Sequence, residues 1–182
     1  MSGILTQSDN NFPFEWVNTS SYRDSNAFRC EIYLKNQQDM LDSLITLFYS
    51  LFGKFKDKLL IYNKSWWDFC LDTWDIEKDE YNYDLRGKSD ETQEYLKILK
   101  EAKLPLGYSG CCTCTDWDRF LSVMLTCIIS HRAPYSHLFC EPDSKIFFYF
   151  HYTGSIGIYY KEESSVIKHL LFTAQKAYDI RE

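Results

Sequence analysis

The chain has 182 residues, of which 45% are hydrophobic and 18% are aromatic, so its length suits one domain with ample side-chain area for a core. Its 7 glycines and 4 prolines are too few for a collagen-like or low-complexity protein. The 20 basic and 26 acidic residues give a net charge of -6. This charge argues against a nucleic-acid binder, which needs a basic face to neutralise phosphates, and it suits a basic protein partner.

The start of the sequence lacks the basic region and apolar run of a secretory signal. The most apolar stretches, 40–52 and 120–129, are too short to span a bilayer. We therefore expect a cytoplasmic protein with no membrane partner. The 7 cysteines are odd in number and unevenly spaced, so in that compartment they are expected to be free thiols.

Five strands are predicted, and the first follows an irregular N-terminal arm over residues 1–26. In the first strand hydrophobic and polar residues alternate, which indicates one buried face. The second is short and can lie parallel to the first through a helical crossover. The last three are separated by turn residues, as in an antiparallel meander. The five predicted strands span residues 27–35, 58–62, 136–140, 145–152 and 155–160.

Five helices are predicted from apolar residues repeated at helical spacing. Asn36 is expected to cap the first helix, and Gly53 is expected to end it in the left-handed conformation. Ser65 is expected to cap the second, with the Asp68 carboxylate three residues further on. The predicted helices begin near residues 37, 65, 89, 115 and 162, and the last extends to 180.

This order of elements predicts the α+β fold class. Residues 27–182 are expected to form a single domain, built on one mixed β-sheet of about five strands that ends in a C-terminal antiparallel meander. Four to five helices are expected to pack against that sheet.

Cysteine and histidine side chains gather between residues 111 and 140. A zinc ion needs thiolate or imidazole ligands that converge tetrahedrally, and the alternative metal set is Cys111, Cys114, Cys127 and His131. However, the Cys-Cys-x-Cys spacing is not that of a zinc knuckle. Cys127 is also flanked by apolar residues typical of a core. We therefore expect no metal and no cofactor.

A Cys–His hydrolase or transferase is the alternative enzymatic hypothesis. Cys112 or Cys114 would be the nucleophile, and His131 or His151 would be the base. No local signature of a cysteine protease or transferase accompanies them. No phosphate-binding glycine motif is present either, and Gly157 is expected to ease a strand crossing.

The segment 68–94 is both acidic and aromatic. It holds ten carboxylates against three basic residues, a net charge of -7 in a chain whose net charge is -6. Carboxylates can steer a basic partner, and tyrosine and tryptophan supply anchoring contacts. A solvated acidic loop is the simpler interpretation. The predicted partner-binding residues are Asp72, Trp74, Asp75, Glu77, Asp79, Glu80, Tyr81, Tyr83 and Asp84.

In its overall character the chain resembles the small immunity proteins encoded beside bacterial contact-dependent toxins, which are acidic, cytoplasmic and aromatic-rich and lack catalytic motifs. The resemblance implies a protein that covers a cognate toxin domain, often a nuclease, and blocks its activity. A nuclease carries a basic substrate groove, which a carboxylate-rich surface can fill. The sequence therefore predicts a non-catalytic inhibitor of a basic partner, and the small Cys–His enzyme is the alternative.

Overall fold

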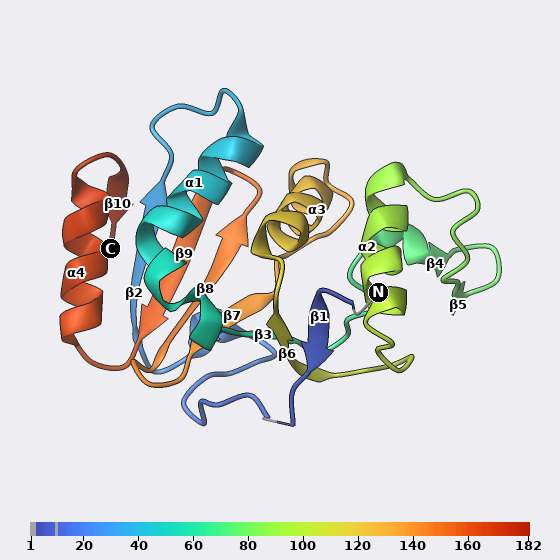
Figure 1. Ribbon diagram of the computed structural model, residues 1–182, viewed down its shortest axis with the longest axis horizontal. Helices are drawn as coiled ribbons and strands as arrows, with labels where there is room; N and C mark the ends of the chain where they lie inside the picture. Colours follow the sequence, from blue (N-terminus) through green and yellow to red (C-terminus); the bar gives the residue numbers. More distant parts are fainter. Residues whose placement is uncertain (1–2, 10) are drawn as a thin grey trace.

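The computed structural model describes residues 3–9 and 11–182, and its centre is one eight-stranded sheet (Figure 1). The strand order is β1-β6-β3-β7-β8-β9-β2-β10, and every pairing among the described residues is antiparallel. The strands are β1 (Leu5–Gln7), β2 (Phe28–Tyr33), β3 (Leu60–Asn63), β6 (Gly110–Cys114), β7 (Leu138–Glu141), β8 (Ile146–His151), β9 (Ser155–Tyr160) and β10 (Asp179–Arg181). A separate two-stranded sheet consists of β4 (Trp74–Asp75) and β5 (Glu80–Tyr81).

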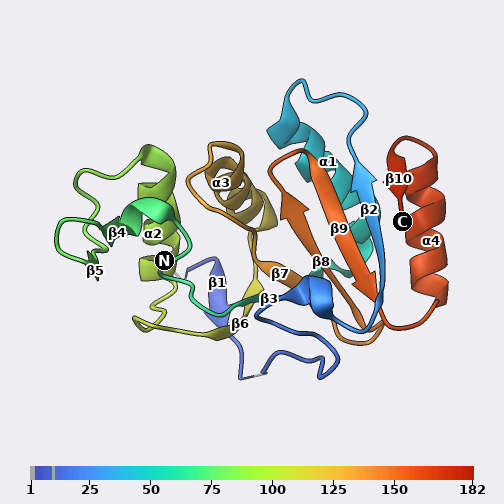
Figure 2. The same ribbon diagram turned by 180° about the vertical axis from the view of Figure 1, so that it is seen from behind.

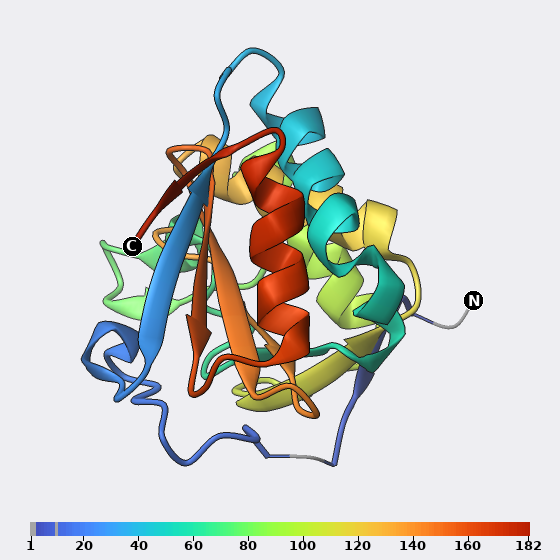
Figure 3. The same ribbon diagram turned by 90° about the vertical axis from the view of Figure 1, so that its left-hand side faces the viewer.

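The helices cover one face of the large sheet, as the view along the sheet shows (Figure 3). Their apolar sides enter a common core with the strands. Ser89 caps α2, because its side chain accepts a hydrogen bond from the Thr92 N–H. Asp116 caps α3 in the same way. The helices are α1 (Met40–Phe52), α2 (Asp90–Glu101), α3 (Trp117–Ile129) and α4 (Ser165–Gln175).

The opposite face of the sheet is covered by the N-terminal arm rather than by helices. Phe14 and Val17 of the arm pack against β3, β6, β7, β8 and β9 in a second apolar cluster. Strand β8 is buried on both faces. Its residues Phe148 and Phe150 pack in the core under the helices. Phe147 and Tyr149 pack in the cluster under the arm. Strands buried on both faces are apolar at nearly every position, which explains the continuous hydrophobic runs in the sequence.

The five predicted strands and the terminal meander are present, but the sheet has three more strands than predicted and is antiparallel, not mixed. The additional strands are β1, β6 and β10. Strand β1 lies inside the region expected to be irregular, and β6 lies between the third and fourth predicted helices, where no strand was predicted. Three neighbours, β7, β8 and β9, separate β2 from β3, so the two strands run parallel, as predicted, but are not hydrogen-bonded to each other.

The helix predicted from Ser65 does not form, and the segment folds into turns followed by the 3₁₀ helix η3 (Leu71–Thr73). Trp66, Trp67, Phe69 and Cys70 are all buried. The indole N–H of Trp66 donates to the Gly110 carbonyl at 2.9 Å, and that of Trp67 donates to Pro105 at 2.8 Å. These long-range bonds fix the segment in place of a helical ladder.

Three further local predictions differ from the structure. Asn36 bonds the Gln38 N–H in a turn, and α1 begins after Asp39, which is left-handed. Gly53 is right-handed, because the chain continues into the 3₁₀ helix η2 (Gly53–Lys58). Gly157 lies in mid-strand under the Tyr149 ring, where a Cβ would come within 2.4 Å of the ring.

Among the described residues, none of the helices has both the length and the apolar character that a membrane span requires.

Candidate functional site

The seven cysteines are free, buried and divided between the two faces of the sheet. On β6, Cys112 and Cys114 face the helices and Cys111 faces the arm, as the alternation of a strand requires. Burial raises the pKa of Cys111 to about 11 and the pKa values of Cys112 and Cys114 to about 12. All three are therefore protonated at neutral pH, and a protonated thiol is a poor nucleophile.

The two candidate base histidines make contacts that do not involve these thiols. His131 is exposed after α3, in a left-handed conformation, and its ring lies 5.2 Å from that of Tyr152. His151 is half-buried at the end of β8, where Nδ1 lies 2.6 Å from Thr153 Oγ1 and burial lowers its pKa. Within the described residues no hydrogen bond joins a cysteine to a histidine, so the paired thiol and imidazole of a hydrolase or transferase are not assembled.

The alternative metal set is likewise dispersed. Cys111 and Cys114 point to opposite faces of β6, and His131 is exposed. Cys127 lies inside the core, with its Sγ 3.8 Å from that of Cys70, and this contact and burial together raise its pKa far above the usual value. Across residues 3–9 and 11–182, no group of three or more His, Cys, Asp or Glu side chains is arranged to hold a metal ion.

The predicted partner-binding segment forms a projection beside α2, at one end of the molecule (Figure 2). We call residues 71–84 the acidic hairpin. In it Trp74 pairs with Tyr81 across β4 and β5, and the connecting loop is ordered by the Asp75 carboxylate. This carboxylate accepts hydrogen bonds from the N–H groups of Glu77 and Lys78 at 3.1 and 3.3 Å. The acidic hairpin is therefore a defined surface and not a loose loop.

A chain of aromatic contacts joins the acidic hairpin to the core. The ring centroids of Trp74 and Tyr81 lie 4.8 Å apart, those of Tyr81 and Tyr83 6.1 Å, and those of Tyr83 and Trp67 5.3 Å. The Tyr83 hydroxyl donates to the Asp68 carboxylate at 2.5 Å, and burial together with this bond raises the pKa of Tyr83. Asp68 also accepts a short hydrogen bond from the Ser65 hydroxyl. Tyr83 is thus a supporting residue, whereas Trp74 and Tyr81 are open to solvent.

The predicted carboxylates of this segment fall into two groups. Asp72 points inward, where it accepts from the Ser89 N–H at 3.0 Å and the Thr92 hydroxyl at 2.6 Å. Asp75 is paired with Lys78, and Asp84 is paired with Arg86, which lowers the pKa of Asp84 to about 2. The side chains that remain are exposed, and no described cation lies within ion-pair distance of them. These unpaired carboxylates are Glu77, Asp79 and Glu80.

Apolar side chains stand exposed beside these unpaired carboxylates. Ile76, at the tip of the loop, is 85% exposed, Leu71 is 58% exposed, and Trp74 and Tyr81 are 40% and 48% exposed. Such a group on a small projection is a feature of binding surfaces. Leu71 and Ile76 were not among the residues predicted from the sequence, because an isolated aliphatic residue in an acidic stretch carries no signal of its exposure.

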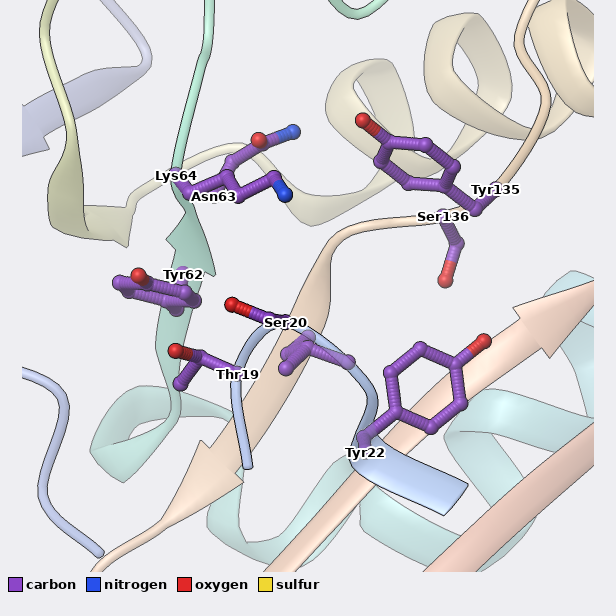
Figure 4. A pocket seen from close by; sticks show the side chains of 9 residues that line it. Thr19, Ser20, Tyr22, Tyr62, Asn63, Lys64, Tyr135 and Ser136 are labelled. Atoms are coloured by element: carbon purple, nitrogen blue, oxygen red, sulfur yellow. The ribbon is translucent and has the colours of Figure 1, made fainter. Parts of the chain in front are cut away.

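A second candidate site was not predicted at all. The arm, the end of β3 and the segment before β7 enclose a cavity of about 120 Å³, which we call the tyrosine cleft (Figure 4). Tyr22 and Tyr135 also border a neighbouring hollow of about 100 Å³ that reaches His151. The cleft is lined by Thr19, Ser20, Tyr22, Tyr62, Asn63, Lys64, Tyr135, Ser136 and Leu138.

The buried amide of Asn63 is the unusual feature of the tyrosine cleft. Asn63 is only 4% exposed, and its Oδ1 accepts the Ser65 N–H at 2.8 Å. Its Nδ2 has no hydrogen-bond partner among the described residues. A buried donor left without an acceptor costs about 1–3 kcal/mol, so native proteins rarely tolerate one without a reason.

Comparison of the chain with protein-family models, with curated proteins and with solved structures found no match. The acidic hairpin and the tyrosine cleft are the two candidate functional sites of the protein.

Proposed function

We propose that the protein is a non-catalytic binding protein that inhibits a basic protein partner through the acidic hairpin. In the finer form of this proposal it is an immunity protein that covers the active or substrate site of a cognate toxin domain, such as a nuclease. The observation that carries the proposal is the exposure of Trp74, Ile76 and Tyr81 next to three carboxylates without cation partners.

The two kinds of side chain have different roles in binding. The exposed apolar groups supply the contact area that is desolvated in a complex, where tryptophan and tyrosine are over-represented among the dominant residues. Glu77, Asp79 and Glu80 attract a basic surface and increase the rate of encounter. Because their charges are not neutralised within the described chain, they remain available for arginine and lysine of a partner.

The rigidity of the acidic hairpin also favours a binding role. The aromatic contacts from Trp74 to Trp67 and the loop bonds to Asp75 hold the exposed groups before any partner arrives. A surface that is already ordered loses less conformational entropy on association, so more of the contact energy appears as affinity.

The proposal is tested by capture of a partner from the native cell extract with the tagged protein at about 0.1 M and about 1 M salt. The Debye screening length falls from about 10 Å at the lower salt concentration to about 3 Å at the higher one. An electrostatically steered complex should therefore be retained at low salt and weakened at high salt. The captured basic protein should then lose its enzymatic or toxic activity when one equivalent of this protein is added.

Two variants separate the contributions. The triple change Glu77→Lys, Asp79→Lys and Glu80→Lys should abolish capture at about 0.1 M salt. Trp74→Ala should weaken binding at both salt concentrations, by about 2 kcal/mol or roughly 30-fold.

The matched control moves the same three charge reversals to Asp42, Asp179 and Glu182, which are exposed at the far end of the molecule on α1, on β10 and directly after β10. If both triple variants lost binding equally, the net charge of the protein, and not the position of these carboxylates, would determine binding. That result would contradict the proposal. Capture that leaves the partner fully active would contradict inhibition.

A further inference from the structure

The tyrosine cleft has a chemical character opposite to that of the protein as a whole. The chain is acidic, yet no carboxylate lines this cavity. One wall carries the Lys64 ammonium, which is exposed and makes no ion pair within the described residues. The cleft therefore presents one cation and several hydroxyl and amide donors, and the Asp68 carboxylate acts electrostatically on its Tyr135 wall.

The orientation of the Asn63 amide is fixed by its neighbour. A backbone N–H can only donate, so the Asn63 atom that faces the Ser65 N–H must be the oxygen. The NH₂ group is thereby placed on the other side, where it has no acceptor. A ligand that satisfies this group must bring a hydrogen-bond acceptor, and a carboxylate oxygen is a strong one.

Figure 4 shows the side chains of Asn63 and Lys64 leaving the end of β3 toward Tyr135, on the same side of the hollow as Tyr62. The Nδ2 atom is itself covered, so an acceptor reaches it only after a side chain of the wall rotates. Lys64 and Tyr135, which are both exposed, are the side chains that we expect to move.

The remaining walls suit a flat ring. Tyr22, Tyr62 and Tyr135 border the cavity from three sides, and aromatic rings favour stacked or edge-on contacts with one another. An apolar cavity of about 150 Å³ is known to hold benzene, so an open cleft of about 120 Å³ matches a single six-membered ring. Burial raises the pKa of Tyr22 and Tyr135, so both hydroxyls stay protonated and can donate.

We propose that the tyrosine cleft binds a small monocyclic aromatic carboxylate. The ring lies among Tyr22, Tyr62 and Tyr135, and the carboxylate accepts hydrogen bonds from the Asn63 Nδ2 group and the Lys64 ammonium. This inference does not rest on the acidic hairpin, and it stands or fails separately from the proposed inhibition of a partner.

The test uses benzoate as the probe, titrated into the ¹⁵N-labelled protein and followed by NMR. The side-chain NH₂ signals of Asn63 should shift progressively with benzoate and saturate. Benzamide, which has the same shape without the charge, should bind about tenfold more weakly, and benzylamine should not shift these signals.

Two variants localise the site. Lys64→Gln removes the cation from an exposed position and should weaken benzoate binding by about tenfold, while Lys54→Gln, the same change at an exposed lysine of η2, should not alter it. Asn63→Asp keeps the acceptor for the Ser65 N–H but replaces the donor by a negative charge, and it should abolish binding.

Each contrary result is decisive. Unchanged Asn63 side-chain signals at the highest soluble benzoate concentration would overturn the proposal. Binding of benzamide or benzylamine as tight as that of benzoate would also overturn it. So would a loss of benzoate affinity of less than about threefold in Lys64→Gln. The lysine variants keep the test valid even if Asn63→Asp fails to fold.

Discussion

His137 is a buried titratable side chain that packs against Trp66 and Phe69 beneath the helices. Its Nε2 lies 2.9 Å from the Tyr95 hydroxyl, and that hydroxyl also lies 3.0 Å from the Trp66 carbonyl. A carbonyl only accepts, so the Tyr95 proton points to Trp66, and His137 must donate from Nε2. Its Nδ1, which lacks a partner, is then the bare nitrogen of the neutral ring. This tautomer avoids a buried unpaired N–H.

The burial of His137 predicts a specific loss of stability in acid. Burial lowers its pKa from 6.5 to about 3, so the unfolded chain binds a proton below pH 6.5 that the folded protein does not bind. The free energy of unfolding should therefore fall by about 1.4 kcal/mol for each pH unit below 6.5 from this residue alone, about 2 kcal/mol by pH 5.

Urea unfolding of the wild-type protein and of His137→Gln at pH 7 and pH 5 measures this contribution. Glutamine can still donate to Tyr95 but does not titrate, so the difference in stability between the two proteins should change by about 2 kcal/mol between the two pH values. Parallel pH profiles would show that His137 is protonated in the folded state.

At the scale of the element, the acidic hairpin combines supporting carboxylates with free ones. Asp72 ties η3 to the start of α2 through Ser89 and Thr92, and the Lys88 ammonium donates to the Asp72 carbonyl at 2.9 Å. Glu77, Asp79 and Glu80, in contrast, extend from the loop and β5 into solvent. The same residue type thus serves folding at one end of the segment and remains unpaired at the other.

This division predicts different effects on stability. Asp72→Ala should reduce the free energy of unfolding by about 1–3 kcal/mol, because it leaves the Ser89 N–H and the buried Thr92 hydroxyl without their acceptor. Glu77→Ala should change it by less than about 0.5 kcal/mol. Thermal or urea unfolding of both variants checks this, and equal effects would mean that the two carboxylates are not distinguished as the structure indicates.

Elements with a clear hydrophobic period were predictable, and those defined by distant contacts were not. Apolar residues repeat at helical spacing in α1 and α3, and apolar and polar residues alternate in β2. These patterns are local, as are those of the meander β7–β9, and they predicted the correct type of element. Ser65 and Asp68 match a helix start, but their side chains bond each other and Tyr83, while Trp66 and Trp67 bond segments some 40 residues away. No local pattern contains such partners.

For the whole molecule, the first and last strands occupy the two edges of the large sheet. Strand β1 pairs with β6 at one edge, and β10 pairs with β2 at the other. Each is only three residues long. Short edge strands offer little unpaired backbone to another chain, which limits edge-to-edge association.

Removal of residues 179–182 should expose the longer strand β2 as an edge. The six residues of β2 alternate between the core and the surface and include the exposed Phe28, so the shortened protein should self-associate with rising concentration. Light scattering after size-exclusion chromatography measures this. Removal of Glu182 alone, which lies outside β10, is the matched control and should leave the oligomeric state unchanged. Identical behaviour of both truncations would contradict a protective role for β10.

The tyrosine cleft shows why a site of this kind escapes prediction. Its walls come from the arm, from the end of β3 and from the segment before β7, which lie far apart in the sequence. Neither spacing nor composition relates Tyr22 to Asn63 or Tyr135. The acidic hairpin, being one continuous segment, could be located from its charge, although the sequence could not separate Asp72 from Glu77.

The alternation of cysteines across the sheet gives the protein internal reporters of local opening. Cys111 and Cys140 lie under the N-terminal arm, whereas Cys112 and Cys114 on β6 and Cys127 on α3 lie in the helix-side core. Detachment of the arm alone would expose the first pair to a thiol reagent and leave the second group protected. The order in which thiols become labelled therefore maps the sequence in which the layers of this fold separate, without any engineered probe.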